Sequence, residues 1–152
     1  MLPYPVTLPT FVDRRTRILR WSAVGIVVAA AGAWQAFRRV EVVGSSMAPT
    51  LMPGDRLVVM GRRWAPPAWP KPGQVIAVRD PRNADRMLIK RVRAVDRPGG
   101  TLEVEGDAPD ASTDSRSFGP VPRSSIVGRA VYRYAPAARS GPGPWLEEYD
   151  QA

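Results

Sequence analysis

Short runs of aliphatic residues, separated by turn signals, dominate the chain after residue 40. Runs of this kind are typical of β-strands, and apolar and polar positions alternate most clearly around Leu102 and Val104. Turns are indicated at Pro53-Gly54-Asp55, Asp80–Asn83 and Arg97–Gly100. No run shows sustained helical periodicity. The pattern predicts strands at Val40–Val43, Arg56–Met60, Gln74–Arg79, Met87–Val95, Thr101–Glu105 and Ile126–Tyr134.

One long apolar segment lies near the N-terminus. Trp21–Phe37 holds 17 residues without a formal charge and is flanked by Arg20 and Arg38. As a helix it would cover about 25 Å, close to the roughly 30 Å of a bilayer core. Flanking arginines and interfacial tryptophans would close the gap. We expect a single transmembrane helix; a cleaved signal peptide and a buried Ala-rich helix are the alternatives.

The charge is concentrated before the strands. Of 22 basic and 14 acidic residues, six arginines and one aspartate lie in residues 1–39, which leaves 16 basic and 13 acidic residues for 40–152. The later part is only mildly basic, so we expect no nucleic-acid partner. Four arginines precede the apolar segment and two follow it. The positive-inside rule therefore predicts a single-pass protein of the cell membrane, with a cytoplasmic N-terminus and an extracytoplasmic β-domain.

Together these patterns predict an all-β protein whose small β-domain follows one N-terminal transmembrane helix. We divide the chain into an Arg-containing segment (1–20), the transmembrane helix (21–37), the β-domain (40–134) and a loose tail (135–152). A Pro-rich loop interrupts the strands at 61–73.

The composition narrows the chemistry sharply. The 152 residues include no His and no Cys, which excludes a Ser-His-Asp triad, a thiol nucleophile, a disulfide and a thiolate zinc site. Hydrolytic chemistry must then use Ser or Thr with Lys, Tyr, a carboxylate or a carboxylate-held metal.

Lys90 is one of only two lysines among 20 arginines. Strand alternation puts Leu88, Val92 and Ala94 on its side of the predicted strand, where it is the only charge. Burial lowers the pKa of a lysine, and a neutral amine is what a lysine general base requires. Arginine stays protonated and cannot serve. A solvated lysine at a sheet edge is the alternative.

A candidate nucleophile lies where the first predicted strand ends. In Gly44-Ser45-Ser46-Met47-Ala48-Pro49, Gly44 permits unusual backbone angles and Pro49 interrupts any helix. A serine on such a turn is exposed, and nearby backbone N–H groups are free to stabilise an oxyanion. Taken alone, such a segment is more often an ordinary turn.

A third polar cluster follows the strand at Thr101–Glu105. It contains Gly106-Asp107, Ser112, Asp114 and Arg116, and the last two can pair and fix the loop. A metal site of aspartates matches no EF-hand spacing, so we expect no metal and no cofactor. A solvated loop is the alternative.

Taken together, three motifs resemble the signal peptidase I family of membrane serine proteases. They are Gly44-Ser45-Ser46-Met47-Ala48-Pro49-Thr50-Leu51 with Pro53-Gly54-Asp55, then Ile89-Lys90-Arg91-Val92, then Gly106-Asp107 with Ser112–Arg116 and Gly119-Pro120-Val121-Pro122. They occur in the family's order and span roughly residues 40–134.

The resemblance implies a serine endopeptidase with a Ser/Lys dyad on a β-rich extracytoplasmic domain. By position, Ser46 is the nucleophile, Lys90 is its general base, and Ser112 orients the amine. Asp114 and Arg116 correspond to a structural pair near the site. The implied partners are membrane lipid and protein substrates with N-terminal signal or leader peptides, cleaved after small residues.

Several departures leave the substrate open. Gly44 stands where some family members place an oxyanion-hole serine, and the family's second β-subdomain is nearly absent. The short form also resembles compact relatives that trim the N-terminus of nickel-type superoxide dismutase. A catalytically inactive, membrane-tethered β-domain for protein binding is the alternative from another class. Ser/Lys autoproteases of SOS repressors carry a DNA-binding segment that this chain lacks.

An apolar surface for the lipid interface is a last expectation. Met47, Leu51, Trp64 and Trp69 lie near the motifs and either form such a surface or pack inside the domain.

Overall fold

The computed structural model describes residues 36–61 and 69–143. The expected transmembrane helix Trp21–Phe37 lies outside this part except for its last two residues, and Phe37 is the first residue of a strand. Within the described ranges, no helix is long and apolar enough to cross a membrane.

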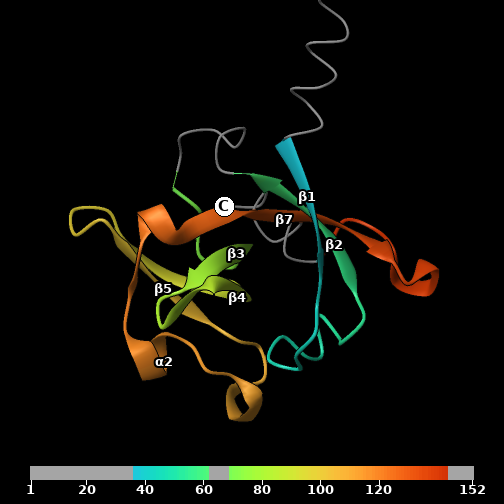
Figure 1. Ribbon diagram of the computed structural model, residues 1–152, viewed down its shortest axis with the longest axis horizontal. Helices are drawn as coiled ribbons and strands as arrows, with labels where there is room; N and C mark the ends of the chain where they lie inside the picture. Colours follow the sequence, from blue (N-terminus) through green and yellow to red (C-terminus); the bar gives the residue numbers. More distant parts are fainter. Residues whose placement is uncertain (1–35, 62–68, 144–152) are drawn as a thin grey trace, which may run out of the picture. The chain divides into compact units, whose positions relative to one another are not determined.

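The described part is a β-sheet protein, which confirms the all-β prediction (Figure 1). Short helical turns lie only in its connections and after its last strand. The strands are β1 (Phe37–Glu41), β2 (Arg56–Gly61), β3 (Val75–Asp80), β4 (Asn83–Asp96), β5 (Thr101–Glu105), β6 (Val121–Pro122) and β7 (Ile126–Ala135). The helical turns are η1 (Pro109–Ala111), α2 (Ser115–Phe118), η2 (Arg123–Ser125) and η3 (Ala137–Arg139). The sequence pattern missed β6 and these turns, because they are too short to show a period.

One antiparallel sheet joins the strands in the order β1-β2-β7-β3-β4-β5-β6. β3 lies between β7 and β4 and is buried on both faces, which explains its continuous apolar run. Its alternate residues enter different cores: Val75 and Ala77 pack in one cluster, Ile76 and Val78 in the other. The sheet is therefore covered on both sides at its centre.

β4 carries the row that was expected to contain Lys90. Leu88, Lys90 and Val92 are buried along one face of the strand, but Ala94 is exposed. An irregularity in the β4–β5 register falls between Val92 and Ala94. A bulge adds one residue to a strand and reverses the facing of those that follow. The expected row therefore ends at Val92.

The apolar surface expected near the motifs is not formed by Met47 and Leu51. Both are fully buried and belong to the core cluster with Val59 and Val75. Trp69 packs against the other cluster, and Trp64 lies outside the described residues. Burial of Met47 and Leu51 removes their apolar surface from water and stabilises the loop between β1 and β2.

The segment after β7, expected to be loose, is tied to the domain as far as Gly141. Arg133 and Gly141 form an antiparallel bridge, and η3 lies between them. Arg139 from η3 pairs with the buried carboxylate of Asp55 at 2.8 Å. A buried charge requires a partner, so Asp55 draws this segment back onto the sheet.

Candidate active site

A pocket of about 430 Å³ lies between β1 and β4. Val40 to Gly44 form one wall, and Arg86 to Lys90 form the other. Ser46 and Lys90 both line it. In the described structure β1 pairs only with β2, and β4 pairs with β5 only from Arg91 onward. Each wall therefore has a strand edge without a neighbouring strand.

The loop between β1 and β2, residues 42–55, contains Ser46 and is fixed by its buried side chains and by backbone hydrogen bonds. Met47 and Leu51 are buried, and the Leu51 N–H donates to the Met47 carbonyl at 2.8 Å. The Ser46 carbonyl accepts from the Ala108 N–H at 3.0 Å, which joins this loop to the Gly-Asp motif. Ser46 is half-buried beside the pocket, whereas Ser45 is exposed.

Gly44 does not have the backbone role that the sequence suggested. Its φ is not positive, and a Cβ added there would meet no atom within 4 Å. The glycine that the site requires is Gly106, because a Cβ there would collide with the Ser112 hydroxyl and the Ser46 carbonyl. Close packing of the two loops explains the glycine of the Gly-Asp motif.

Lys90 is only 2% exposed, and its amine lies 2.8 Å from the Ser112 Oγ. Burial lowers the pKa of Lys90 below its ordinary value. The Asp114 carboxylate opposes this shift, whereas the guanidinium groups of Arg116 and Arg86 add to it. The site therefore favours a neutral amine more than water does.

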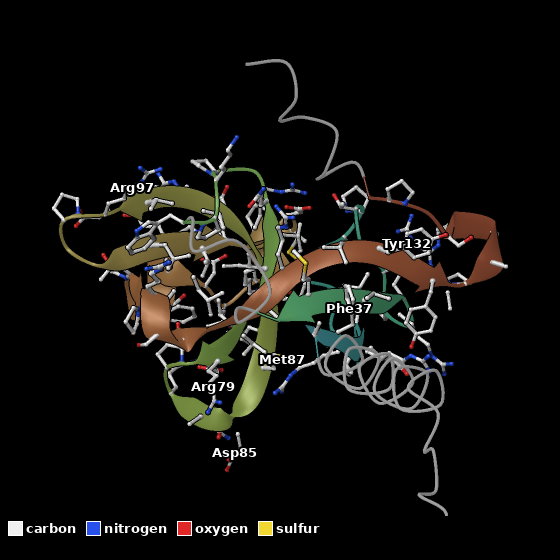
Figure 2. The ribbon with its side chains drawn as sticks, turned by 90° about the horizontal axis from the view of Figure 1, so that it is seen from above. Phe37, Arg79, Asp85, Met87, Arg97 and Tyr132 are labelled. Carbon is white, nitrogen blue, oxygen red and sulfur yellow. The ribbon has the colours of Figure 1, made fainter. Side chains whose placement is uncertain are left out.

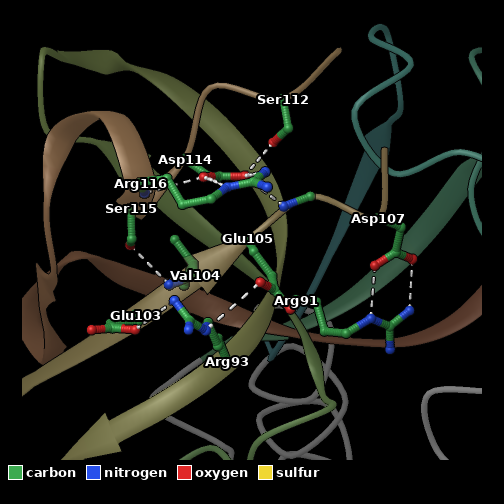
Figure 3. Close-up of polar contacts among 11 residues, drawn as sticks. Arg91, Arg93, Glu103, Val104, Glu105, Asp107, Ser112, Asp114, Ser115 and Arg116 are labelled. Atoms are coloured by element: carbon green, nitrogen blue, oxygen red, sulfur yellow. Dashed lines mark hydrogen bonds and ion pairs between the residues drawn. The ribbon is translucent and has the colours of Figure 1, made fainter. Parts of the chain in front are cut away.

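The hydrogen-bond directions around Ser112 follow from Asp114 (Figure 3). Hydrogen bonds from Arg116 hold the pKa of Asp114 well below its usual range, so this carboxylate only accepts. The Ser112 hydroxyl donates its one hydrogen to Asp114 Oδ2 at 2.6 Å. Ser112 must then accept from Lys90. A neutral lysine amine that donates one hydrogen in this way keeps its lone pair for another partner.

Asp114 is fully buried and satisfied on both oxygens. Arg116 donates from Nε at 2.9 Å and from its terminal nitrogen at 2.6 Å, as Figure 3 shows. The Gly106 N–H donates at 2.9 Å. Asp114 also caps α2 through the Arg116 N–H. One carboxylate thus fixes α2, the Gly-Asp motif and Ser112 together.

The sequence did not reveal the role of Arg91, which follows Lys90 on the opposite face of β4. Its guanidinium donates to both carboxylate oxygens of Asp107, at 2.8 and 2.7 Å (Figure 3). It also donates to the Gly73 carbonyl at 2.7 Å. This pair anchors the Gly-Asp motif to β4. The sequence shows Arg91 directly after Lys90 and Asp107 directly after Gly106, but no pattern in it indicates that these two residues form an ion pair.

Among residues 36–61 and 69–143, no group of three or more acidic side chains is arranged to hold a metal ion. The aspartates of the third motif instead have separate neighbours: Asp107 binds Arg91, and Asp114 binds Arg116.

The family comparison agrees with this architecture. A family model described as "Signal peptidase, peptidase S26" matches residues 15–108 and 97–135. The chain belongs to this family. The resemblance seen in the motifs is thereby confirmed.

Curated relatives have the same kind of name. The chain is 34% identical to mitochondrial ATP-independent inner membrane protease subunit 1b of Arabidopsis thaliana, over 66% of this chain and 72% of that protein. It is 36% identical to subunit 1a from the same plant, over 63% of this chain and 69% of the relative. It is 33% identical to mitochondrial inner membrane protease subunit 2 of Danio rerio, over 65% of this chain and 64% of that protein. This chain is therefore a signal-peptidase-like member of a protease family.

Proposed function

We propose that this protein is a membrane-anchored serine endopeptidase that cleaves signal or leader peptides after small residues. Ser46 is the nucleophile and Lys90 is the general base. One observation carries the proposal: Ser46 and Lys90, 44 positions apart in the sequence, line one pocket, and the lysine is buried there against Ser112.

The reaction uses only side chains present in the chain. Ser46 Oγ attacks the scissile carbonyl carbon while the neutral Lys90 amine takes the hydroxyl proton. Lys90 then gives a proton to the leaving amine, and the acyl-enzyme remains on Ser46. Lys90 next takes a proton from water, whose oxygen attacks the acyl carbon. The bond from that carbon to Ser46 Oγ then breaks, Lys90 returns the proton to Ser46 Oγ, and the new carboxyl group leaves as its carboxylate. Ser112 supports each step by holding the amine at 2.8 Å.

A backbone donor is available for the oxyanion. Among the described residues, none accepts a hydrogen bond from the Ser46 N–H. Because Gly44 contributes no hydroxyl, we assign the negative charge of the tetrahedral intermediate to this backbone group.

The pocket walls suit an extended substrate. β1 and β4 both have an edge without a neighbouring strand, so a peptide lying between them can pair with backbone on each side. The walls are mainly apolar, with Val42, Leu88 and Ile89 among them. They fit the small residues that signal peptidase substrates present before the cleaved bond.

The membrane anchor is part of the proposal. The curated relatives are named as inner membrane proteases, and the uncharged segment Trp21–Phe37 is the feature of this sequence that would attach it to a bilayer. We place the N-terminus in the cytoplasm and the β-domain outside the cell membrane. A single cysteine at Ser117, labelled by an impermeant reagent in intact cells, tests this orientation. Labelling only after lysis reverses it.

The direct test uses two adjacent serines. Purified full-length protein in detergent is incubated with Ala-x-Ala precursors, and cleavage is followed by mass spectrometry. Ser46→Ala should lose more than about 10³-fold in turnover, whereas Ser45→Ala should retain most activity because Ser45 is exposed. The reverse result would mean that the nucleophile is Ser45.

The same assay separates the remaining functions. Cleavage of an N-terminally extended nickel-type superoxide dismutase, with no cleavage of Ala-x-Ala precursors, would identify a dedicated maturation protease. A folded wild-type protein that binds these substrates and cleaves none would be an inactive binding domain.

A further inference from the structure

Arg86 lies in the pocket wall and neither bonds nor exchanges a proton in the reaction proposed above; it affects that reaction only by helping to lower the pKa of Lys90. It stands four positions before Lys90 on β4, and alternation places both side chains on one face of the strand. At about 3.3 Å per residue, the two residues are separated by roughly 13 Å along the pocket. Arg86 therefore lies upstream of the reacting atoms.

The Arg86 guanidinium is available to a ligand. It is 65% exposed, and its ion pair with Asp80 is long, at 4.0 Å. Arg82 already binds both oxygens of Asp80, at 2.9 and 2.7 Å. A second cation beside a satisfied carboxylate leaves this end of the hairpin with a net positive charge.

The opposite wall does not cancel this charge. Glu41 is the acidic residue that lines the pocket, and it pairs with Arg56 at 3.4 Å. Asp85 neighbours Arg86 in the sequence but emerges on the other face of β4. The positive charge of Arg86 is therefore not neutralised within the pocket and is available to a substrate side chain.

Both walls run toward the reactive groups. β1 leads into the loop that carries Ser46, and β4 runs through Arg86 to Lys90. If the substrate presents the residues before its cleaved bond to this pocket, its strand runs parallel to β4. The residue beside Arg86 is then the fourth or fifth before the cleaved bond.

We propose that Arg86 is a specificity-determining residue that selects an acidic side chain, Asp or Glu, four or five residues before the cleaved bond. The inference rests on the proposed peptidase function and adds the substrate class to it. The preference is electrostatic, because a guanidinium and a carboxylate form a charge-assisted hydrogen bond.

The test compares peptides that differ at one position. Each contains Ala-x-Ala before the cleaved bond and has Asp, Ala or Lys at one site, scanned from four to seven residues before that bond and over three residues after it. Wild-type kcat/KM should favour Asp over Ala by about threefold to fivefold at the fourth or fifth site, the range of an exposed ion pair, and should disfavour Lys. The preference should shrink in 0.5 M salt.

Charge reversal identifies the residue responsible. Arg86→Glu should invert the Asp-to-Lys preference. Because Arg86 also helps to lower the pKa of Lys90, the variant changes the activity toward all three peptides alike, and the readout is the ratio between peptides at one pH. Arg79→Glu is the matched control: it makes the same charge change on the neighbouring strand, near Met87 at the end of the same hairpin, but Arg79 does not line the pocket (Figure 2). This control should retain the wild-type preference.

Three outcomes would overturn the proposal: an unchanged preference in Arg86→Glu, inversion by Arg79→Glu as well, or a preference confined to residues after the cleaved bond. An Arg86→Glu effect that appears only with anionic lipid vesicles, and equally for all peptides, would assign Arg86 to the membrane instead.

Binding keeps this inference separate from the protease proposal. The Ser46→Ala variant binds peptides without turnover, and fluorescence anisotropy should show the Asp peptide binding more tightly than the Lys peptide. If no peptide is cleaved by wild type but this order is seen, the protease function fails and the selection by Arg86 stands. Equal binding of the two peptides rejects the selection.

Discussion

Asp114 and Asp55 are both fully buried and paired with arginines, yet they support different parts of the site. Asp114 accepts from Ser112, which in turn holds the amine of Lys90. Asp55 accepts from the Met52 N–H at 2.9 Å, near the end of the loop that contains Ser46. One carboxylate supports Lys90, the proposed base, and the other supports the loop that carries Ser46, the proposed nucleophile.

The two aspartates also differ in how completely they are satisfied. Asp114 receives hydrogen bonds on both oxygens, several of them from its own loop. Asp55 Oδ2 accepts from Arg133 at 3.2 Å, but Oδ1 has only the ion pair with Arg139 and no hydrogen bond of good geometry. Arg133 also donates to the Thr50 carbonyl at 3.1 Å.

The two aspartates therefore affect different properties of the site: Asp114 affects the protonation of Lys90, and Asp55 affects only the position and stability of a loop. A change at Asp114 reaches Lys90 through a single hydroxyl, so it alters protonation as well as packing. A change at Asp55 reaches Ser46 only through backbone, so it alters the position and stability of the loop. The following predictions test this division, beginning with the largest effect.

Replacement of Lys90, the proposed base, should have the largest effect on turnover. Lys90→Arg keeps the charge but cannot supply a neutral amine near pH 7, so turnover should fall about 10²–10⁴-fold, nearly as far as in Lys90→Ala. Wild-type activity should rise with pH through the lowered pKa of Lys90, because only the neutral amine accepts a proton. Turnover from pH 6 to 10, with circular dichroism of each variant, checks both statements.

Substantial activity in a folded Lys90→Arg variant would reduce Lys90 to a packing residue. In that case the base side of the site would have no special electrostatic role, and the contrast between the two aspartates would disappear.

Matched amide variants compare the aspartates directly. Asp114→Asn places an amide N–H₂ group among the donors to this site and leaves buried donors such as the Gly106 N–H without an acceptor. With two such groups unsatisfied, the unfolding free energy should fall by about 2–5 kcal/mol. Asp55→Asn can keep its oxygen toward Met52 and Arg133, and Arg139 can turn to solvent, so the loss should be about 1–3 kcal/mol. Urea unfolding at pH 7 measures both values.

The pH profiles of the same variants sharpen the contrast. The Asp114 carboxylate raises the pKa of Lys90, so Asp114→Asn should shift the rise of activity toward lower pH. Asp55→Asn should leave the pH at which activity rises unchanged. In wild type, the lowered pKa of Asp114 stabilises the fold above about pH 4, and this contribution is lost as pH falls further. Equal shifts in both amide variants would contradict the division.

Gly44→Ser should have the smallest effect and the opposite sign. Its surroundings are open and its φ is ordinary, so the serine fits without strain. A hydroxyl there can add a donor to the backbone N–H of Ser46, and kcat should rise by less than about tenfold with KM little changed. Unchanged kcat in a stable Gly44→Ser variant would show that the hydroxyl does not reach the oxyanion.

Local pattern was sufficient for much of the architecture. Alternation and turn residues placed most strands, including Thr101–Glu105 without error, and the apolar neighbours of Lys90 indicated its burial. Pattern failed where one residue changed the geometry. The bulge after Val92 exposed Ala94. The first strand begins at Phe37, whereas the pattern predicted a helix up to Phe37 and a strand only from Val40.

By itself the sequence determined the succession of strands along the chain and membership of the family, because both can be read from short stretches of residues. Only the tertiary structure decided that Lys90 is buried rather than solvated at a sheet edge, and which strands are neighbours. It also decided that Arg91 binds Asp107 and that Asp55 holds residues after β7 against the loop that contains Ser46. Such contacts join residues far apart in the chain, and their partners are selected by buried charge and sheet register, which no local pattern encodes.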